Sequence, residues 1–298
     1  SAVAVATAMS PLSLATQTAG STIRPASWCG VFGMKPSFGL IPRTGVLKTT
    51  DTLDNIGFYG RDINDLRLSL DSLRVHGSNF PIMQRKLKEN SSIKKSWKVG
   101  LVKSHLSEHA PDYVHRDIQK FASKLNMISC IELEELNLPE ETHKAHELHS
   151  RVYDPCLSYY FKRELESAPE KISNIFLEQV EKGKQNSPED YKFALNEQSA
   201  MAKKMESFFR ENEIDFLFHY SSNGSAPIIE PKVNQDLNLL WTLSWMPVIN
   251  IPQFFCPKGL PYGLQLIGPR YSDYRMFEFL KQLEKLDLVP KLAKLSPE

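Results

Sequence analysis

Hydrophobic and polar positions follow two patterns along the chain. Short apolar runs, which are typical of buried strands, occupy residues 98–102, 128–133, 214–218, 247–251 and 261–267. Stretches with the spacing or composition of helices cover residues 2–14, 61–73, 114–125, 140–181 and 274–283. Strands that alternate with helices predict an α/β fold in which a mixed β-sheet is sandwiched between helices.

Two segments show how the pattern changes along the chain. Apolar residues in 61–73 recur at the spacing of a helix with one buried stripe, at Ile63, Leu66, Leu70 and Leu73. Residues 81–97 are instead basic and polar, so we interpret them as a solvated surface connector. We expect this connector to lie within a single domain that spans residues 1–298.

Composition narrows the classes of function. The chain has 298 residues, 41% of them hydrophobic, so it can bury a large core. Its net charge of +1 argues against nucleic acid or an anionic membrane as a partner. The most apolar window, 237–255, contains asparagines and prolines that suit a helix and a buried strand better than a membrane span.

The four cysteines are widely spaced and form no Cys-x-x-Cys pair. This spacing suggests neither a zinc site nor a disulfide framework, and it favours a reducing, cytoplasmic compartment. We expect no cofactor. His143, His146 and His149 lie three residues apart on a predicted helix, where only adjacent pairs can share an ion, so we expect no metal site there.

Residues 16–36 place small residues and glycines around one serine, Ser21. Ala19 and Gly20 allow a ligand to approach the backbone closely, and consecutive amides at such a site can converge on an oxyanion. Ile23 stands where the Gly-x-Ser-x-Gly turn of an α/β-hydrolase needs its second glycine, which excludes that motif. Ser21 is therefore a candidate nucleophile of another kind.

The same segment resembles the amidase signature family. Ala-Gly-Ser is followed by Ile-Arg-Pro-Ala-Ser, an aromatic residue, Cys-Gly and then Gly-Met-Lys-Pro. Residues 238–273 are similar to the C-terminal signature of that family, with Pro-Val-Ile-Asn-Ile-Pro ahead of Gly-Leu-Pro-Tyr-Gly-Leu-Gln-Leu-Ile-Gly-Pro-Arg. Gln17, where aspartate is common, indicates the Gln-Thr-Ala-Gly-Ser subgroup. Two long blocks in the family's order are far more specific than one short motif.

The resemblance implies a serine nucleophile that is activated by a lysine through a second serine in a cis peptide. By the family's spacing, this lysine and serine would lie upstream of Ser1, and the apolar start of the chain reads as the interior of a buried element. We therefore interpret the chain as a C-terminal fragment of an amidase, with a processed or short protein as the alternative. Lys35 belongs to the Gly-Met-Lys-Pro element, which the resemblance makes structural.

The resemblance also assigns roles around Ser21. The backbone amides of Thr18, Ala19, Gly20 and Ser21 match the oxyanion hole of the family. Arg24 is a candidate to clamp a substrate carboxylate, and Arg43 is a second candidate, with structural pairing as the alternative for both. Trp241 is a candidate wall of the substrate pocket, with core packing as the alternative.

The leading functional hypothesis is an amidase that hydrolyses a small carboxylic amide through a Ser21 acyl-enzyme. The first alternative is the A subunit of a tRNA-dependent amidotransferase, which uses the same chemistry to free ammonia from glutamine. The second is a non-catalytic scaffold protein. The resemblance also makes a homodimer plausible.

Overall fold

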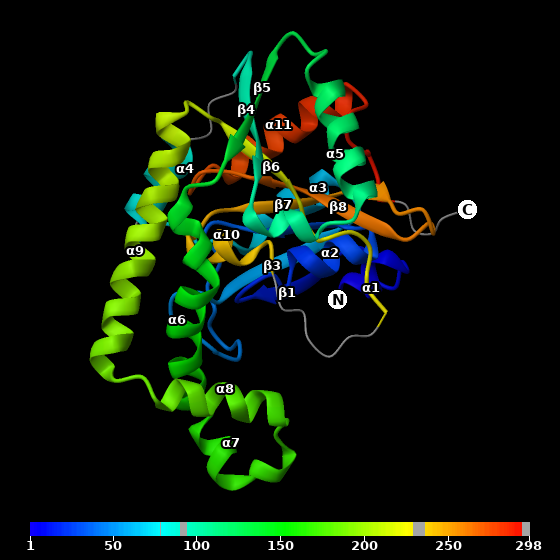
Figure 1. Cartoon of the computed structure of the whole chain (residues 1–298). Helices are drawn as coiled ribbons and strands as arrows, with labels where there is room; N and C mark the ends of the chain where they lie inside the picture. Colours follow the sequence, from blue (N-terminus) through cyan, green and yellow to red (C-terminus); the bar gives the residue numbers. More distant parts are fainter. Residues whose placement is uncertain (78, 90–93, 229–235, 294–298) are drawn as a thin grey trace.

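The computed structural model of the chain describes residues 1–77, 79–89, 94–228 and 236–293. In these residues, eight strands form one sheet in the order β1-β3-β2-β7-β8-β6-β4-β5 (Figure 1). They are β1 (Ser13–Gln17), β2 (Phe32–Lys35), β3 (Asn55–Gly60), β4 (Trp97–Lys103), β5 (Ile131–Asn137), β6 (Phe216–Tyr220), β7 (Val248–Phe255) and β8 (Pro261–Ile267). β4 runs parallel to both β5 and β6, whereas the other neighbours are antiparallel. The sheet is therefore mixed, as predicted.

Helices cover both faces of this sheet (Figure 1). The α-helices are α1 (Ala2–Ala6), α2 (Ile23–Cys29), α3 (Ile63–Leu73), α4 (Pro81–Glu89), α5 (Asp112–Leu125), α6 (Ala145–Tyr160), α7 (Lys162–Ser167), α8 (Asn174–Lys184), α9 (Pro188–Glu211), α10 (Leu239–Leu243) and α11 (Asp273–Lys285). Three short 3-10 helices are η1 (His105–His109), η2 (Glu140–Lys144) and η3 (Pro169–Lys171).

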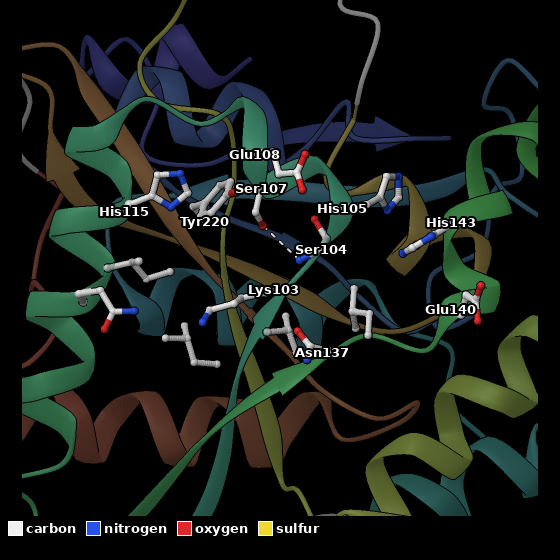
Figure 2. Close-up of a pocket in the computed structure, with 15 residues that line it drawn as sticks. Lys103, Ser104, His105, Ser107, Glu108, His115, Asn137, Glu140, His143 and Tyr220 are labelled. Carbon is white, nitrogen blue, oxygen red and sulfur yellow. Dashed lines mark hydrogen bonds between the residues drawn. The ribbon is translucent and has the colours of Figure 1, made fainter.

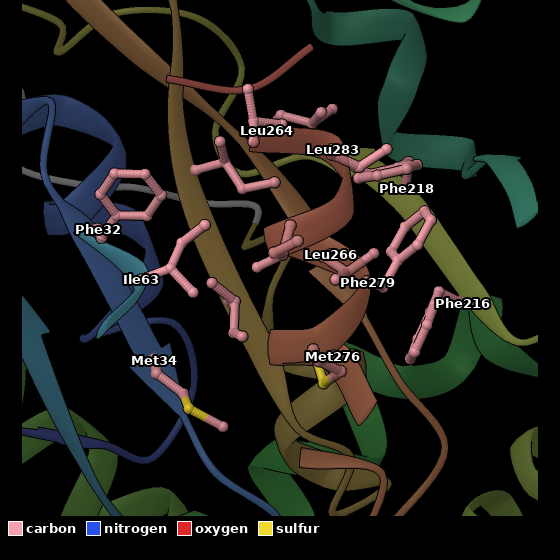
Figure 3. Packing of buried hydrophobic residues seen from close by; sticks show 14 of the residues in the cluster. Phe32, Met34, Ile63, Phe216, Phe218, Leu264, Leu266, Met276, Phe279 and Leu283 are labelled. Atoms are coloured by element: carbon pink, nitrogen blue, oxygen red, sulfur yellow. The ribbon is translucent and has the colours of Figure 1, made fainter. Parts of the chain in front are cut away.

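The alternation of side chains along β6 shows how the two layers form, because successive strand residues point to opposite faces. Phe216 and Phe218 pack in the core that α3, α5 and α11 cover, and the Phe216 ring stacks on Phe279 of α11 with centroids 5.1 Å apart (Figure 3). Leu217 points to the other face, into the core that α6, α9 and α10 cover. The prediction of a mixed sheet sandwiched between helices is confirmed.

Most predicted elements are present. α3, α5 and α11 match the predicted helices, and residues 140–181 are mostly helical. β4, β7 and β8 lie where the apolar runs place them. β5 and β6 begin two to three residues later than predicted, because Ile128 and Ile214 belong to turns that close the preceding helices. The Ile128 amide bonds the Leu125 carbonyl, and the Ile214 amide bonds the Phe209 carbonyl.

The apolar window 237–255 folds as a short helix, α10, followed by the buried strand β7, as predicted. Of the helices in the part of the chain that the structure describes, none has the length and apolar character needed to cross a membrane.

The prediction of one helix over residues 2–14 is wrong. α1 ends at Ala6, and Ser13–Gln17 is the edge strand β1, which pairs with β3 from Ser13↔Tyr59 to Gln17↔Asn55. Pro11 lies between the two elements and lacks the amide that a continuing helix needs. Small apolar residues alone do not distinguish a helix from a strand.

The interpretation of residues 81–97 as a surface connector stays a prediction, although part of the segment is helical. Pro81–Glu89 forms α4, and Leu87 is buried in the core cluster to which α3 and α11 also contribute. Residues 90–93 of the segment lie outside the described residues, and β4 begins at Trp97. The basic side chains of α4 therefore surround an apolar anchor that the composition concealed.

The buried His219 of β6 should make the stability of the fold depend on pH. The side chain is 1% exposed, its Nδ1–H donates to the Tyr220 carbonyl at 2.9 Å, and burial lowers its pKa to about 4. In the unfolded chain the histidine takes up a proton near pH 6.5, which the folded state resists. Between pH 6.5 and 4.5, the free energy of unfolding should therefore fall by about 2 kcal/mol more in the wild type than in His219→Asn.

Chemical denaturation at several pH values measures this difference. Asparagine keeps a donor near the Nδ1 position but cannot titrate. The exposed His76 supplies the matched control, and His76→Asn should leave the pH dependence unchanged. Identical pH profiles for the wild type and His219→Asn would contradict the prediction.

Candidate functional site

The candidate nucleophile lies in a short loop between β1 and α2. The loop comprises residues 18–22, and the Ser21 side chain is exposed. Ser21 lines a cavity of about 510 Å³ together with Leu14, Ile56 and Tyr59. Among the described residues, none forms a hydrogen bond with Ser21 Oγ. The hydroxyl is therefore open to a small molecule.

Every carbonyl from Thr18 to Ser21 has a hydrogen-bond donor, and each donor comes from a different element. The Thr18 carbonyl accepts from His149 Nε2 of α6 at 2.9 Å. The Ala19 carbonyl accepts from Thr242 Oγ1 of α10 at 2.6 Å. The carbonyls of Gly20 and Ser21 accept from the Arg24 amide at 2.9 Å and from Tyr59 Oη at 3.2 Å. These four bonds fix the orientation of four consecutive peptide planes.

Three amides of the same loop, unlike its carbonyls, lack a hydrogen-bond partner among the described residues. Within the described part of the chain, no group accepts a hydrogen bond from the amides of Ala19, Gly20 or Ser21. Buried or half-buried amides without an acceptor are uncommon, because each unpaired donor is costly. Three such donors in a row beside a serine hydroxyl can bind an oxyanion. Thr18 contributes differently, since its hydroxyl donates to Asp54 at 2.9 Å.

The Gln17 side chain anchors the loop through three buried hydrogen bonds. It is fully buried, and its Oε1 accepts from the amides of Thr22 and Ile23, at 2.9 and 3.0 Å, at the start of α2. Its Nε2 donates to Thr242 Oγ1 at 2.9 Å. Gln17 thus links β1, α2 and α10, and it satisfies two helix amides that would otherwise lack an acceptor. An aspartate at this position would lack the donor toward Thr242.

Asp236 belongs to this site, although no sequence pattern predicts it. Its carboxylate forms a salt bridge with Arg24 Nη1 at 2.5 Å and accepts two bonds from Asn238 at 3.0 Å. A Cβ atom on Gly20 would come within 2.3 Å of both carboxylate oxygens, so any side chain there would displace the Asp236 carboxylate. An isolated Asp in the polar stretch before α10 gives no signal of this contact in the sequence.

Arg24 lies where the sequence predicts, beside the loop. Its Nη1 atom is engaged by Asp236, and its guanidinium lies over the Trp28 ring at 5.7 Å. Without this arginine, the Asp236 charge would oppose any negative charge that develops at the loop amides. The pair is thus an electrostatic part of the site, and clamping of a substrate carboxylate by Arg24 stays a prediction.

Arg43 and Trp241 are both held by structural contacts. Arg43 donates to the carbonyls of Thr50 and Asp51 at 2.9 and 2.8 Å, which is the structural pairing with loop carbonyls given as its alternative. Trp241 is 1% exposed and packs in the core between the sheet and α6 and α9. Neither residue lines the cavity that contains Ser21, and their substrate contacts stay predictions.

The three histidines of the predicted triplet have separate partners. His149 Nε2–H donates to the Thr18 carbonyl, and His146 Nε2 accepts from the Asp236 amide at 3.1 Å. Burial lowers the pKa of both, so both remain neutral at pH 7. The ring of His143, which lies in η2, is instead 4.6 Å from that of His105. The three-residue spacing in the sequence suggested only a test for metal binding. It did not predict that His149 contacts Thr18 or that His146 contacts Asp236.

Lys35 is a buried cation at the end of β2. It is fully buried, and its ammonium donates to the carbonyls of Pro36, at 3.1 Å, and of Met246. Burial lowers the pKa of Lys35 to about 7, while the nearby Asp273 opposes this shift. Its hydrogen bonds are therefore structural, joining the end of β2 to the segment before β7.

Replacing Gln17 tests whether this side chain holds the loop. Gln17→Ala removes one donor and two acceptor bonds from a buried position. We expect it to lower the free energy of unfolding by about 2–4 kcal/mol, because two helix amides lose their acceptor and Thr242 Oγ1 loses the bond that it accepts. Denaturant unfolding measures the loss.

The neighbouring Thr16 provides the control for this prediction. It lies on the same strand but is exposed, so Thr16→Ser should change the free energy of unfolding by less than about 0.5 kcal/mol. Equal stability of the Gln17→Ala variant and the wild type would show that the loop is held without Gln17.

Comparison with known proteins identifies relatives over nearly the whole chain. The family model described as Amidase matches residues 1–277. A glutamyl-tRNA(Gln) amidotransferase A subunit of Clostridium acetobutylicum is 26% identical over 322 residues, which cover 96% of this chain and 67% of the relative. The chain thus spans about two thirds of the length of this relative.

Solved structures show the same fold. The 6-aminohexanoate cyclic dimer hydrolase, solved with its substrate, superposes with a TM-score of 0.81 at 19% identity and covers 97% of this chain and 67% of that chain. The native peptide amidase of Stenotrophomonas maltophilia superposes with a TM-score of 0.78 at 19% identity and covers 100% and 66% of the two chains.

Proposed function

Because the chain belongs to the amidase family, we propose that it is the part of an amide hydrolase that carries the nucleophile, Ser21. The substrate is a small carboxylic amide, and the products are an acid and ammonia or an amine. The main support for this proposal is the hydrogen-bonding pattern of the loop around Ser21. An exposed serine hydroxyl adjoins three amides that lack acceptors among the described residues, and the four carbonyls of the loop are all held by other residues.

The loop suits the charge changes of acyl transfer. Ser21 Oγ forms a bond to the amide carbon as its proton leaves, and the carbonyl electrons move to the oxygen. The amides of Ala19, Gly20 and Ser21 then stabilise this oxyanion, and one such donor is commonly worth about 3 kcal/mol in the transition state. The tetrahedral intermediate collapses as the C–N bond breaks and the leaving amine takes up a proton. Water then attacks the acyl-enzyme and releases the acid.

Ser21 needs a base, because a serine hydroxyl is a weak nucleophile at neutral pH. The described residues place no base in hydrogen-bond contact with Ser21 Oγ. In our proposal the proton passes through a bridging serine to a neutral lysine, as the family resemblance implies, and both residues belong to chain that precedes Ser1. The same relay returns the proton to the leaving amine.

Amide hydrolysis by the protein expressed from its complete reading frame tests this proposal. Ser21→Ala should lower kcat/KM by roughly 10⁴-fold or more, because the acyl-enzyme cannot form. Release of acid from a panel of small primary amides measures the effect. Ser27→Ala is no suitable control, since Ser27 Oγ bonds two buried partners. The exposed Ser123, on α5, allows Ser123→Ala as the matched control, and its activity should equal that of the wild type.

The 298-residue chain alone should show no appreciable turnover, because its described residues place no base in contact with Ser21 Oγ. Turnover by this chain that Ser21→Ala abolishes would contradict the proposed relay, and full activity of the Ser21→Ala protein would contradict the nucleophile itself.

The glutaminase reaction of an amidotransferase A subunit is the second candidate. It is favoured by the relative from Clostridium acetobutylicum, whose name describes such a protein. Glutamine in the same panel separates the two functions. Ammonia release restricted to glutamine supports the second candidate, and turnover of several unrelated amides supports the first.

We also propose that Arg24 selects substrates that carry a carboxylate, through the part of its guanidinium that Asp236 does not occupy. Arg24→Ala should lower kcat/KM for an acidic amide at least about tenfold relative to its neutral analogue. The ratio of the two kcat/KM values is the measurement, because loss of the Asp236 partner affects both substrates.

The double variant Arg24→Ala/Asp236→Ala separates the two effects. Removing Asp236 should restore turnover of the neutral amide in part, because no uncompensated carboxylate then faces the oxyanion. It should not restore the preference for the acidic amide. An unchanged preference in Arg24→Ala would exclude this role of Arg24.

A further inference from the structure

A second cavity, of about 780 Å³, opens where β4, β5 and β6 end (Figure 2). These are the parallel strands of the sheet, and Lys103, Asn137 and Tyr220 at their carboxyl ends line the cavity. η1, α5 and η2 supply the remaining walls. Open α/β sheets bind ligands at this edge, and the volume suits a small organic molecule. No residue of the loop around Ser21 lines this cavity, so it is a separate site.

The interior of the cavity is apolar but contains one buried polar atom. Leu101, Val102 and Ile118 are 3–6% exposed and line the cavity. Tyr220 is 3% exposed, and within the described residues its hydroxyl has no hydrogen bond of ordinary geometry. Burial raises the pKa of Tyr220 to about 12, and a weak hydrogen-bond contact from the Ser107 hydroxyl partly opposes this shift. The phenol therefore stays protonated, and its hydrogen bond remains available to a ligand.

The rim of the cavity is negatively charged. Lys103 is neutralised by Glu135 at 2.6 Å, on the outer face of the sheet edge. Glu108 and Glu140 line the cavity, are exposed, and form no salt bridge with a described residue. The His105 ring lies near that of His143, and burial together with the neighbouring histidines lowers the pKa of His105. His105 is therefore neutral at pH 7, and the two carboxylates dominate the local charge.

We propose that this cavity binds a primary ammonium compound with an apolar body and a hydrogen-bonding group at its far end. The ammonium lies at the rim near Glu108 or Glu140, whose exposed carboxylates attract a cation. The apolar body lies against the apolar residues that line the cavity, among them Leu101 and Ile118. The far polar group reaches the buried Tyr220 hydroxyl, which has no hydrogen bond of ordinary geometry with a described residue.

Binding of three related probes to the full-length protein tests the proposal. Tyramine has all three features, phenethylamine lacks the hydroxyl, and 3-(4-hydroxyphenyl)propanoate replaces the ammonium with a carboxylate. Titration calorimetry should show that tyramine binds at least about tenfold more tightly than the carboxylate and about threefold more tightly than phenethylamine. Tyramine binding should weaken as salt is added, because the rim is exposed.

Variants assign the binding to this cavity. Glu108→Gln/Glu140→Gln should weaken tyramine binding about tenfold, and Tyr220→Phe should remove the advantage of tyramine over phenethylamine. The control is Glu141→Gln, which removes a charge from the same 3-10 helix at a residue that pairs with Lys204 and does not line the cavity. Its tyramine affinity should equal that of the wild type.

Absence of saturable tyramine binding, tighter binding of the carboxylate, or equal losses in Glu141→Gln would each overturn the proposal. Thermal unfolding shows whether Tyr220→Phe and the rim variants are folded. The probes do not require Ser21, so Ser21→Ala should bind tyramine like the wild type. The result therefore stands apart from the outcome of the amide hydrolysis assay.

Discussion

The orientation of the peptide planes from Thr18 to Ser21 is the constraint on which the proposed chemistry depends. An amide bond has one donor and one acceptor, and when the carbonyl is held on one side the N–H points to the other. In this loop a histidine, a threonine, a backbone amide and a tyrosine hold the four carbonyls. The amides of Ala19, Gly20 and Ser21 find no acceptor among the described residues, and this unpaired state is what an oxyanion would relieve.

The sheet and its helices place those four donors. Tyr59 lies on β3, which pairs with β1, and its hydroxyl reaches the Ser21 carbonyl, while α10 leads into β7 and brings Thr242 to the Ala19 carbonyl. α6 packs on the face of the sheet that α9 and α10 also cover, and it supplies His149. Gln17 joins three of these elements through one side chain. The contacts that hold the loop thus include partners more than 100 positions away in the sequence.

Much of this arrangement could be predicted from the sequence, and the limits have physical causes. The mixed sheet between helices follows from apolar runs that alternate with helical stretches, and Ser21 from the density of small residues around it. β1 resembles the end of a helix because Ala and Leu suit either structure until Pro11 and the partner strand decide between them. α4 is hidden because Leu87, the buried residue among those of α4 whose burial the structure describes, leaves little periodic signal among lysines and arginines. The partners of the loop leave no local signal at all, since Asp236, His146 and His149 act on residues that are distant in the sequence.

The most direct test of the account is the structure of the protein, expressed from its complete reading frame, with a small boronic acid bound. A boronic acid forms a tetrahedral adduct with an active serine and mimics the intermediate of acyl transfer. We expect a bond from boron to Ser21 Oγ, with one boronate oxygen about 2.7–3.1 Å from amides of Ala19, Gly20 or Ser21. An unmodified Ser21, or an adduct whose oxygens all point away from these amides, would contradict it.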